Sequence, residues 1–227
     1  MSFEDLADRV REVEQRIQAA VARGGHAQKV RIVAVTKTHG PDAVEAAASA
    51  GVREVGENKV QEAIDKMERV TVPVAWHLIG HLQRNKVKSL ERFALLHSLD
   101  SSRLADAVHE YGLARGRAVE ALVQVNVSGE ESKGGFPLAE LPVEAERFVA
   151  RPGVRVAGVM TMAPFDADEG TLRRVFHGAR EARDLLQAAG HPAFEISMGM
   201  SSDYEVAVEE GATLVRLGTI LFGARGT

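Results

Sequence analysis

The 227-residue sequence contains no cysteine, and this absence excludes three kinds of chemistry. Without thiols the chain forms no disulfides, binds no metal through thiolates and has no cysteine nucleophile. Long apolar runs are missing too, because no stretch approaches the roughly 18 apolar residues of a membrane-spanning helix. The first segment, MSFEDLADRVREVEQRI, is charged from its fourth residue and lacks the apolar region of a secretory signal. We therefore expect a cytoplasmic protein with no membrane partner.

A surplus of basic residues is also absent. Lysine and arginine total 28 against 32 acidic residues, a net charge of −4, whereas nucleic-acid-binding proteins normally carry a basic surplus. We therefore expect no nucleic-acid partner. No linker rich in proline, serine or glutamine interrupts the chain, so residues 1–227 are predicted to form a single domain.

Short apolar strands alternate with amphipathic helices along most of the chain. The first 23 residues are predicted to form a helix, because their apolar residues recur at intervals of three and four. Eight strand-like runs follow, at residues 30–35, 52–55, 74–78, 94–97, 119–125, 154–160, 194–196 and 214–217. Helical segments separate them, at residues 41–50, 59–69, 84–89, 103–115, 138–150, 172–189 and 204–210.

This alternation predicts the α/β class, and eight strand–helix units favour a closed (β/α)8 TIM barrel over an open sheet. Very few residues follow the eighth strand. We therefore expect the N-terminal helix to cover the barrel where a full-length eighth helix would otherwise lie.

Seven polar or otherwise unusual residues lie at or near the C-terminal ends of the predicted strands. They are Lys37, Asn58, His77, Asn126, Met160, Ser197 and Arg216. In a (β/α)8 barrel these strand ends share one mouth, and the active site is built there. The pattern therefore predicts that residues far apart in the sequence converge on one site.

Lys37 directly follows the buried run IVAVT, where an ammonium group is costly unless it is paired. Partial desolvation would lower its pKa and make the neutral amine available for imine formation. A lysine paired with a carboxylate at the barrel rim explains the same position equally well. The residue alone leaves both interpretations open.

Two segments near the C-terminus have the composition of a phosphate site. In SMGMSSDYE, residues 197–205, small residues precede a helix, and Ser201 could donate a hydrogen bond to an anion. In VRLGTILFG, residues 215–223, Gly218 and Thr219 directly follow the eighth strand. The loops after strands seven and eight commonly bind phosphate in such barrels. Two ordinary turns are the alternative, and the position favours phosphate.

Arg216 and the histidines allow more than one interpretation. Arg216 could form a structural ion pair or, in a site that holds a pyridine ring, face the ring nitrogen and disfavour its protonation. His77 and His81 have the spacing of helical metal ligands, but Gly80 separates them and no cysteine is available. We therefore expect no metal site.

At this point several segments match a known family. They are VAVTKTH (33–39), GENKVQEA (56–63), WHLIGHLQRNK (76–86), HSLD (97–100), VNVSGEESKGGF (125–136), GVMTMAP (158–164) and SMGMSSDYEVAVEEGATLVRLGTILFG (197–223). The chain resembles the pyridoxal phosphate homeostasis proteins, also called proline synthase co-transcribed proteins, which are single-domain relatives of the alanine racemase barrel. The matching segments extend over nearly the whole chain.

The resemblance implies a fold-type III barrel in which pyridoxal 5′-phosphate forms an aldimine with Lys37. It also assigns the other cofactor-binding residues. Ser201, Gly218 and Thr219 would hold the phosphate, Arg216 would approach the pyridine nitrogen, and Asn58, His77, Met160 and Ser197 would line the rest of the pocket.

The resemblance further implies a cofactor carrier, not an enzyme, with apo forms of pyridoxal-phosphate enzymes as partners. Racemases need a second acid/base, often a tyrosine, and this chain has only Tyr111 and Tyr204, neither at a convincing position. We therefore expect no catalytic residues, and we expect a monomer because no apolar patch is left unassigned. A weak amino-acid racemase and an aldolase that forms an imine with a phosphorylated sugar are the alternatives.

Overall fold

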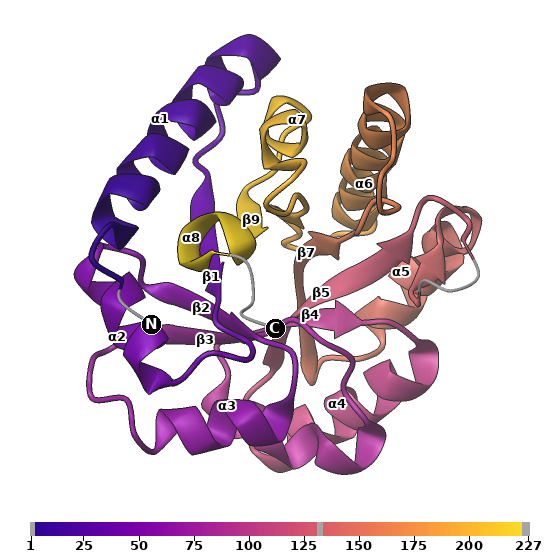
Figure 1. Cartoon of the computed structure of the whole chain (residues 1–227). Helices are drawn as coiled ribbons and strands as arrows, with labels where there is room; N and C mark the ends of the chain where they lie inside the picture. The colour runs from indigo at the N-terminus through magenta and orange to yellow at the C-terminus, as the bar shows by residue number, and fades with distance from the viewer. Residues whose placement is uncertain (1–2, 131–133, 224–227) are drawn as a thin grey trace.

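Eight parallel strands close into a barrel in the structure, a computed structural model that describes residues 3–130 and 134–223 (Figure 1). They are β1 (Arg31–Val35), β2 (Glu54–Glu57), β3 (Ala75–Leu78), β4 (Leu95–Leu99), β5 (Val119–Asn126), β7 (Val154–Met160), β8 (Glu195–Ser197) and β9 (Leu214–Leu217). Neighbours pair in the order β4-β3-β2-β1-β9-β8-β7-β5, and pairing between β4 and β5 closes the ring. The two-residue strand β6 (Phe136–Pro137) pairs only with β5. The predicted (β/α)8 barrel is therefore confirmed.

Helices surround the strands (Figure 1). They are α1 (Leu6–Gly24), α2 (Pro41–Ser49), α3 (Val60–Met67), α4 (Ser102–Ala114), α5 (Leu141–Val149), α6 (Glu169–Ala188), α7 (Tyr204–Glu209) and α8 (Thr219–Phe222), with 3-10 helices η1 (Arg84–Arg92) and η2 (Leu138–Glu140). The segment at 84–89, predicted as an ordinary helix, is part of η1. Its buried residues Val87 and Leu90 are three apart, which matches the three-residue turn of a 3-10 helix. Among the described residues, no helix is both long enough and apolar enough to cross a bilayer.

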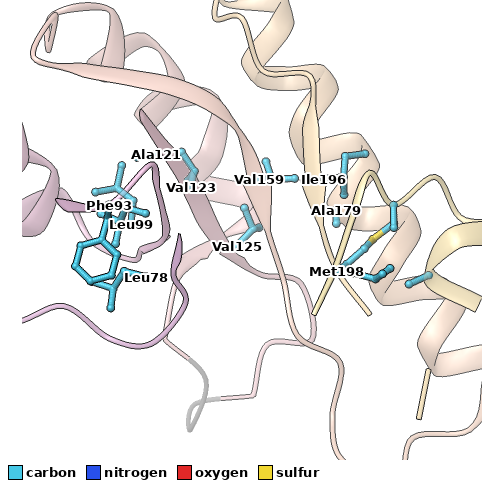
Figure 2. Packing of buried hydrophobic residues seen from close by; sticks show 14 of the residues in the cluster. Leu78, Phe93, Leu99, Ala121, Val123, Val125, Val159, Ala179, Ile196 and Met198 are labelled. Carbon is cyan, nitrogen blue, oxygen red and sulfur yellow. The ribbon is translucent and has the colours of Figure 1, made fainter. Parts of the chain in front are cut away.

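The strands bury both of their faces, which explains their nearly continuous apolar sequences. On β1, Ile32 and Ala34 belong to the large apolar cluster between the barrel and the helices, whereas Val33 belongs to a smaller cluster inside the barrel. Figure 2 shows the larger cluster, in which Val159 and Ile196 of neighbouring strands lie beside Ala179 of α6. Successive residues of a strand therefore point alternately toward the helices and into the barrel.

The N-terminal helix α1 covers the barrel beside β9, where the described helix α8 has only four residues. It packs against α7, α8 and α2, the neighbours that a helix after the eighth strand would have. Its apolar stripe is buried, and a Cβ atom at Gly24 would lie 2.3 Å from the Glu209 carbonyl oxygen of α7. The Arg9 guanidinium also donates to the Leu221 carbonyl at 2.7 Å. The expected role of the N-terminal helix is therefore confirmed.

Candidate functional site

Lys37 lies at the C-terminal end of the barrel, two residues beyond the last residue of β1. The Thr36 amide still donates to the Gly56 carbonyl at 3.2 Å, so the pairing with β2 continues up to the lysine. Lys37 itself lies in the turn that follows β1, next to the mouth formed by the C-terminal strand ends. That its ε-amino group faces the inside of the mouth stays a prediction.

Arg216 is a buried cation in the barrel interior, with 5% of its surface exposed. Its guanidinium donates to the Ser197 hydroxyl at 2.6 Å and to the Thr161 carbonyl at 2.9 Å, and both acceptors are neutral. Burial lowers the pKa of Arg216 to about 10, and the negative charge of Asp203 opposes this shift. The guanidinium therefore stays protonated at neutral pH. It is available for an electron-rich atom of a ligand, such as a pyridine nitrogen.

A row of hydrogen bonds extends from Arg216 across the barrel. The Ser197 hydroxyl contacts Nδ1 of His97 at 2.9 Å, and Nε2 of His97 contacts Nδ1 of His77 at 2.9 Å. Nε2 of His77 lies 3.9 Å from Oε2 of Glu54. Burial lowers the pKa of His77 to about 4 and that of His97 well below its usual value. Both imidazoles are therefore neutral at physiological pH.

The placement of His77 differs from the predicted one. His77 is buried in the interior and, with Arg31 and Glu54, lines a cavity of about 280 Å³ at the N-terminal end of the barrel. It is linked to Arg216 only through His97 and Ser197. The structure thus joins His77 to the candidate site indirectly, and its part in the pocket stays a prediction.

The loops after β8 and β9 come together as the phosphate prediction requires. The Ser201 hydroxyl accepts a hydrogen bond from the Ile220 amide in the first turn of α8 at 3.2 Å. Gly218 caps this turn, and a Cβ atom there would meet nothing closer than 3.4 Å. Ser201 and Gly218 are partly exposed and Thr219 is exposed, so hydroxyl and amide donors are accessible at one place. This set of neutral donors beside small residues fits a phosphate group.

Asn58 and Met160 lie in different parts of the barrel mouth. Asn58 follows β2 and is partly exposed, and its carbonyl lies against Gly80, where a Cβ atom would approach to 2.3 Å. Met160 is 1% exposed and packs in the interior cluster with Val33 and Leu122. Met160 therefore supports the floor of the barrel mouth, and Asn58 lies on its rim.

Sequence reasoning overlooked three buried polar residues near the predicted site. These are Glu57, Lys66 and His97. Glu57 follows the strand predicted at 52–55 and Lys66 lies inside the helix predicted at 59–69, but nothing in the local sequence indicates that they form an ion pair at 2.7 Å. His97 interrupts an apolar strand, and this interruption was the one available signal of a buried polar network.

His77 and His81 take part in separate interactions. Nδ1 of His81 contacts the Asp100 carboxylate at 2.7 Å, whereas His77 contacts His97. Across residues 3–130 and 134–223, no three histidine, aspartate or glutamate side chains gather in a way that could hold a metal ion. The described geometry therefore offers no support for a metal centre.

Comparisons with known proteins identify the family and the fold. The family model described as alanine racemase, N-terminal domain matches residues 9–226. The pyridoxal phosphate homeostasis protein of Aquifex aeolicus is 40% identical over 225 residues, which cover 97% of this chain and 99% of that protein. PipY of Synechococcus elongatus, solved with pyridoxal phosphate bound, superposes with a TM-score of 0.85 at 34% identity and covers 96% of this chain and 100% of its own. Alanine racemase from Corynebacterium glutamicum shares the fold, with a TM-score of 0.76 at 16% identity, over 98% of this chain and 62% of the racemase.

Proposed function

The chain belongs to the alanine racemase N-terminal domain family and, within it, to the pyridoxal phosphate homeostasis proteins, and from this premise we propose that it binds pyridoxal 5′-phosphate and maintains its intracellular supply. It holds and transfers the cofactor without turnover of its own. When bound, the cofactor supplies an aldehyde that condenses with an amine and a ring that withdraws electrons.

One observation carries this proposal: Lys37 directly follows β1, and the buried Arg216 is on the adjacent strand β9. β1 pairs with β9, and Val33 of β1 is in register with Arg216. A cation buried against neutral acceptors alone is costly, and a ligand nitrogen facing it would offset part of that cost. We assign Lys37 as the covalent attachment point and Arg216 as the partner of the ring nitrogen.

The remaining assignments follow from the neighbours of these two residues. The hydroxyls of Ser201 and Thr219 and the backbone at Gly218 hold the phosphate. Asn58, Met160 and Ser197 line the ring pocket, and His77 supports it indirectly through His97 and Ser197. The permanently charged guanidinium of Arg216 keeps the ring nitrogen unprotonated, which weakens the cofactor as an electron sink.

The positions of the two tyrosines support a carrier over a racemase. The Tyr111 hydroxyl donates to Glu91 on the outer surface of the barrel at 2.8 Å. Tyr204 is buried in α7, which packs against α1. Tyr204 begins α7 just after the β8 loop, but its hydroxyl interacts with Arg16 of α1. Neither tyrosine is therefore placed as the second acid/base that a racemase needs.

We further propose that the chain acts as a single cytoplasmic domain and a monomer, and that apo forms of pyridoxal-phosphate enzymes receive the cofactor from it. A carrier of this kind releases pyridoxal phosphate to proteins that bind pyridoxal phosphate more tightly.

The visible absorption spectrum tests the proposal. Purified protein mixed with pyridoxal phosphate is expected to show a visible band that borohydride bleaches. Lys37→Ala is expected to lack the band, and Lys86→Ala, which removes an exposed lysine of η1, is expected to keep it. If the unsubstituted protein shows no band at any cofactor concentration, the proposal fails. Borohydride trapping of a sugar phosphate would then favour the aldolase, and amino-acid turnover above the Lys37→Ala background would favour a racemase.

A further inference from the structure

A group of charged side chains is buried directly behind Lys37. Thr36, just beyond β1, and Glu57 of β2 point outward toward α3, because the Thr36 hydroxyl contacts Glu57 and Glu57 contacts Lys66. Lys66 of α3 points back at them. Glu57 has no exposed surface and Lys66 has 5% exposed. An ion pair therefore lies in the apolar layer between barrel and helices.

Lys66 uses all three of its donors in this group. Its Nζ lies 2.7 Å from the Thr36 carbonyl, 2.7 Å from Oε1 of Glu57 and 2.9 Å from Oε1 of Glu62. The Thr36 hydroxyl also donates to Glu57 at 2.5 Å. Lys66 is thereby held as an ammonium on the outer side of the barrel and has no remaining donor for a ligand.

The same group also holds the residue after Lys37. The Thr38 amide donates to Oε1 of Glu62 at 2.6 Å. Thr38 has a φ of +69°, in the left-handed region that a β-branched residue rarely adopts. Such a conformation persists only where the surroundings fix it. Lys37 is thus anchored on both sides, by Lys66 at Thr36 and by Glu62 at Thr38.

Stability alone does not explain why this layer contains charges. A buried ion pair is often no more stable than well-packed apolar residues of the same volume. Burial raises the pKa of Glu57, although hydrogen bonds from Lys66 and Thr36 oppose the shift, and Oε2 of Glu57 has no hydrogen-bond partner in the structure. The charged side chains instead supply hydrogen bonds to the backbone on either side of Lys37.

We propose that Glu57, Lys66 and Glu62 are positioning residues that fix residues 36–38 so that the Lys37 ε-amino group reaches the cofactor aldehyde. The inference rests on the proposed function, in which Lys37 is the attachment point. Attack of an amine on an aldehyde depends steeply on placement, because a displacement of about 1 Å can reduce such a step about a hundredfold.

Two sets of variants test this role. Glu62→Gln weakens the anchor of Thr38, and Asp65→Asn, an exposed carboxylate on the same helix, is the matched control. The double variant Glu57→Gln/Lys66→Met removes the buried charge pair while keeping its volume. The dissociation constant of pyridoxal phosphate, from titration of the visible band, is expected to rise about tenfold or more in Glu62→Gln and in the double variant and to stay unchanged in Asp65→Asn.

A rescue separates positioning from general loss of structure. Glycine adopts the left-handed conformation without strain, so Thr38→Gly in the Glu62→Gln background is expected to restore most of the lost affinity. Because this pair changes only partly exposed or exposed residues, it gives a result even if the double variant fails to fold.

The outcomes are distinguishable. A visible band in the unsubstituted protein together with unchanged dissociation constants in all variants would overturn the positioning role and leave the proposed function standing. Lost affinity that Thr38→Gly does not restore would also overturn it. Absence of the band from the unsubstituted protein would end the proposed function and this inference together.

Discussion

At the scale of single residues, the barrel interior contains a series of hydrogen bonds that all donate in the same direction. The Arg216 guanidinium can only donate, so the Ser197 hydroxyl accepts from it and is free to donate to His97. His97 can then donate to His77, whose remaining ring nitrogen faces Glu54. Neutral imidazoles suit this arrangement, because each provides one donor and one acceptor.

This neutrality predicts a dependence of stability on pH. The pKa of His77 is about 4 in the folded protein against an ordinary value of 6.5, so the unfolded chain binds the proton more readily. The stabilisation of the folded protein by neutral His77 is complete above pH 6.5. As the pH falls toward 4, the free energy of unfolding decreases by about 3 kcal/mol. Urea unfolding between pH 7 and pH 4.5 measures it. His77→Gln is expected to lose less stability over this range than the unsubstituted protein, and equal losses would contradict the account.

The sequence indicates some of the site residues and not others, for physical reasons. Lys37 and Arg216 could be singled out as candidates because each is a charged residue at or near the end of an apolar run. The ion pair between Glu57 and Lys66 could not be predicted, because it depends on how α3 packs on the barrel. The position of His77 near the end of a strand predicts that it lies at the mouth. In the structure it is buried in the interior, beside the cavity that Arg31 and Glu54 line.

At the scale of elements, the helix that completes the ring comes from the opposite end of the chain. Within the part of the chain that the structure describes, β9 is followed by the four-residue helix α8, which is too short to cover the barrel. The buried stripe of α1 covers this position, and Gly25 ends the helix in the left-handed conformation. Its amphipathic pattern could be recognised from sequence, as could the β-branched runs that form the strands. The 3-10 geometry of η1 could not, because periodicity in a short segment does not separate it from an α-helix.

Packing of α1 predicts a measurable loss of stability. Ile17 is 3% exposed in the middle of the buried stripe. Ile17→Ala is expected to lower the free energy of unfolding by about 2–4 kcal/mol, because it leaves a cavity at the junction of α1 with the barrel. Gln15→Ala, at an exposed position of the same helix, is expected to change it by less than about 0.5 kcal/mol. Urea unfolding compares the two, and equal effects would mean that α1 does not seal the barrel.

At the scale of the whole molecule, closure of the barrel creates the site. Lys37 and Arg216 are 179 positions apart in the sequence (216 − 37), yet the pairing of β1 with β9 places them on adjacent strands. The proposed phosphate donors come from the loops after β8 and β9, which contact each other through Ser201 and Ile220. The alternation of strands and helices was enough to predict this convergence, because strand ends in a closed barrel share one mouth.

The central claim is that Lys37 is the lysine that carries the cofactor. The most direct measurement is to mix the protein with pyridoxal phosphate, reduce the mixture with borohydride and locate the modified lysine by peptide mass spectrometry. The account predicts one dominant adduct on the peptide that contains Lys37, with Lys66 unmodified because its ammonium is buried and fully hydrogen-bonded. An unmodified Lys37, or adducts spread evenly over the exposed lysines, would contradict it.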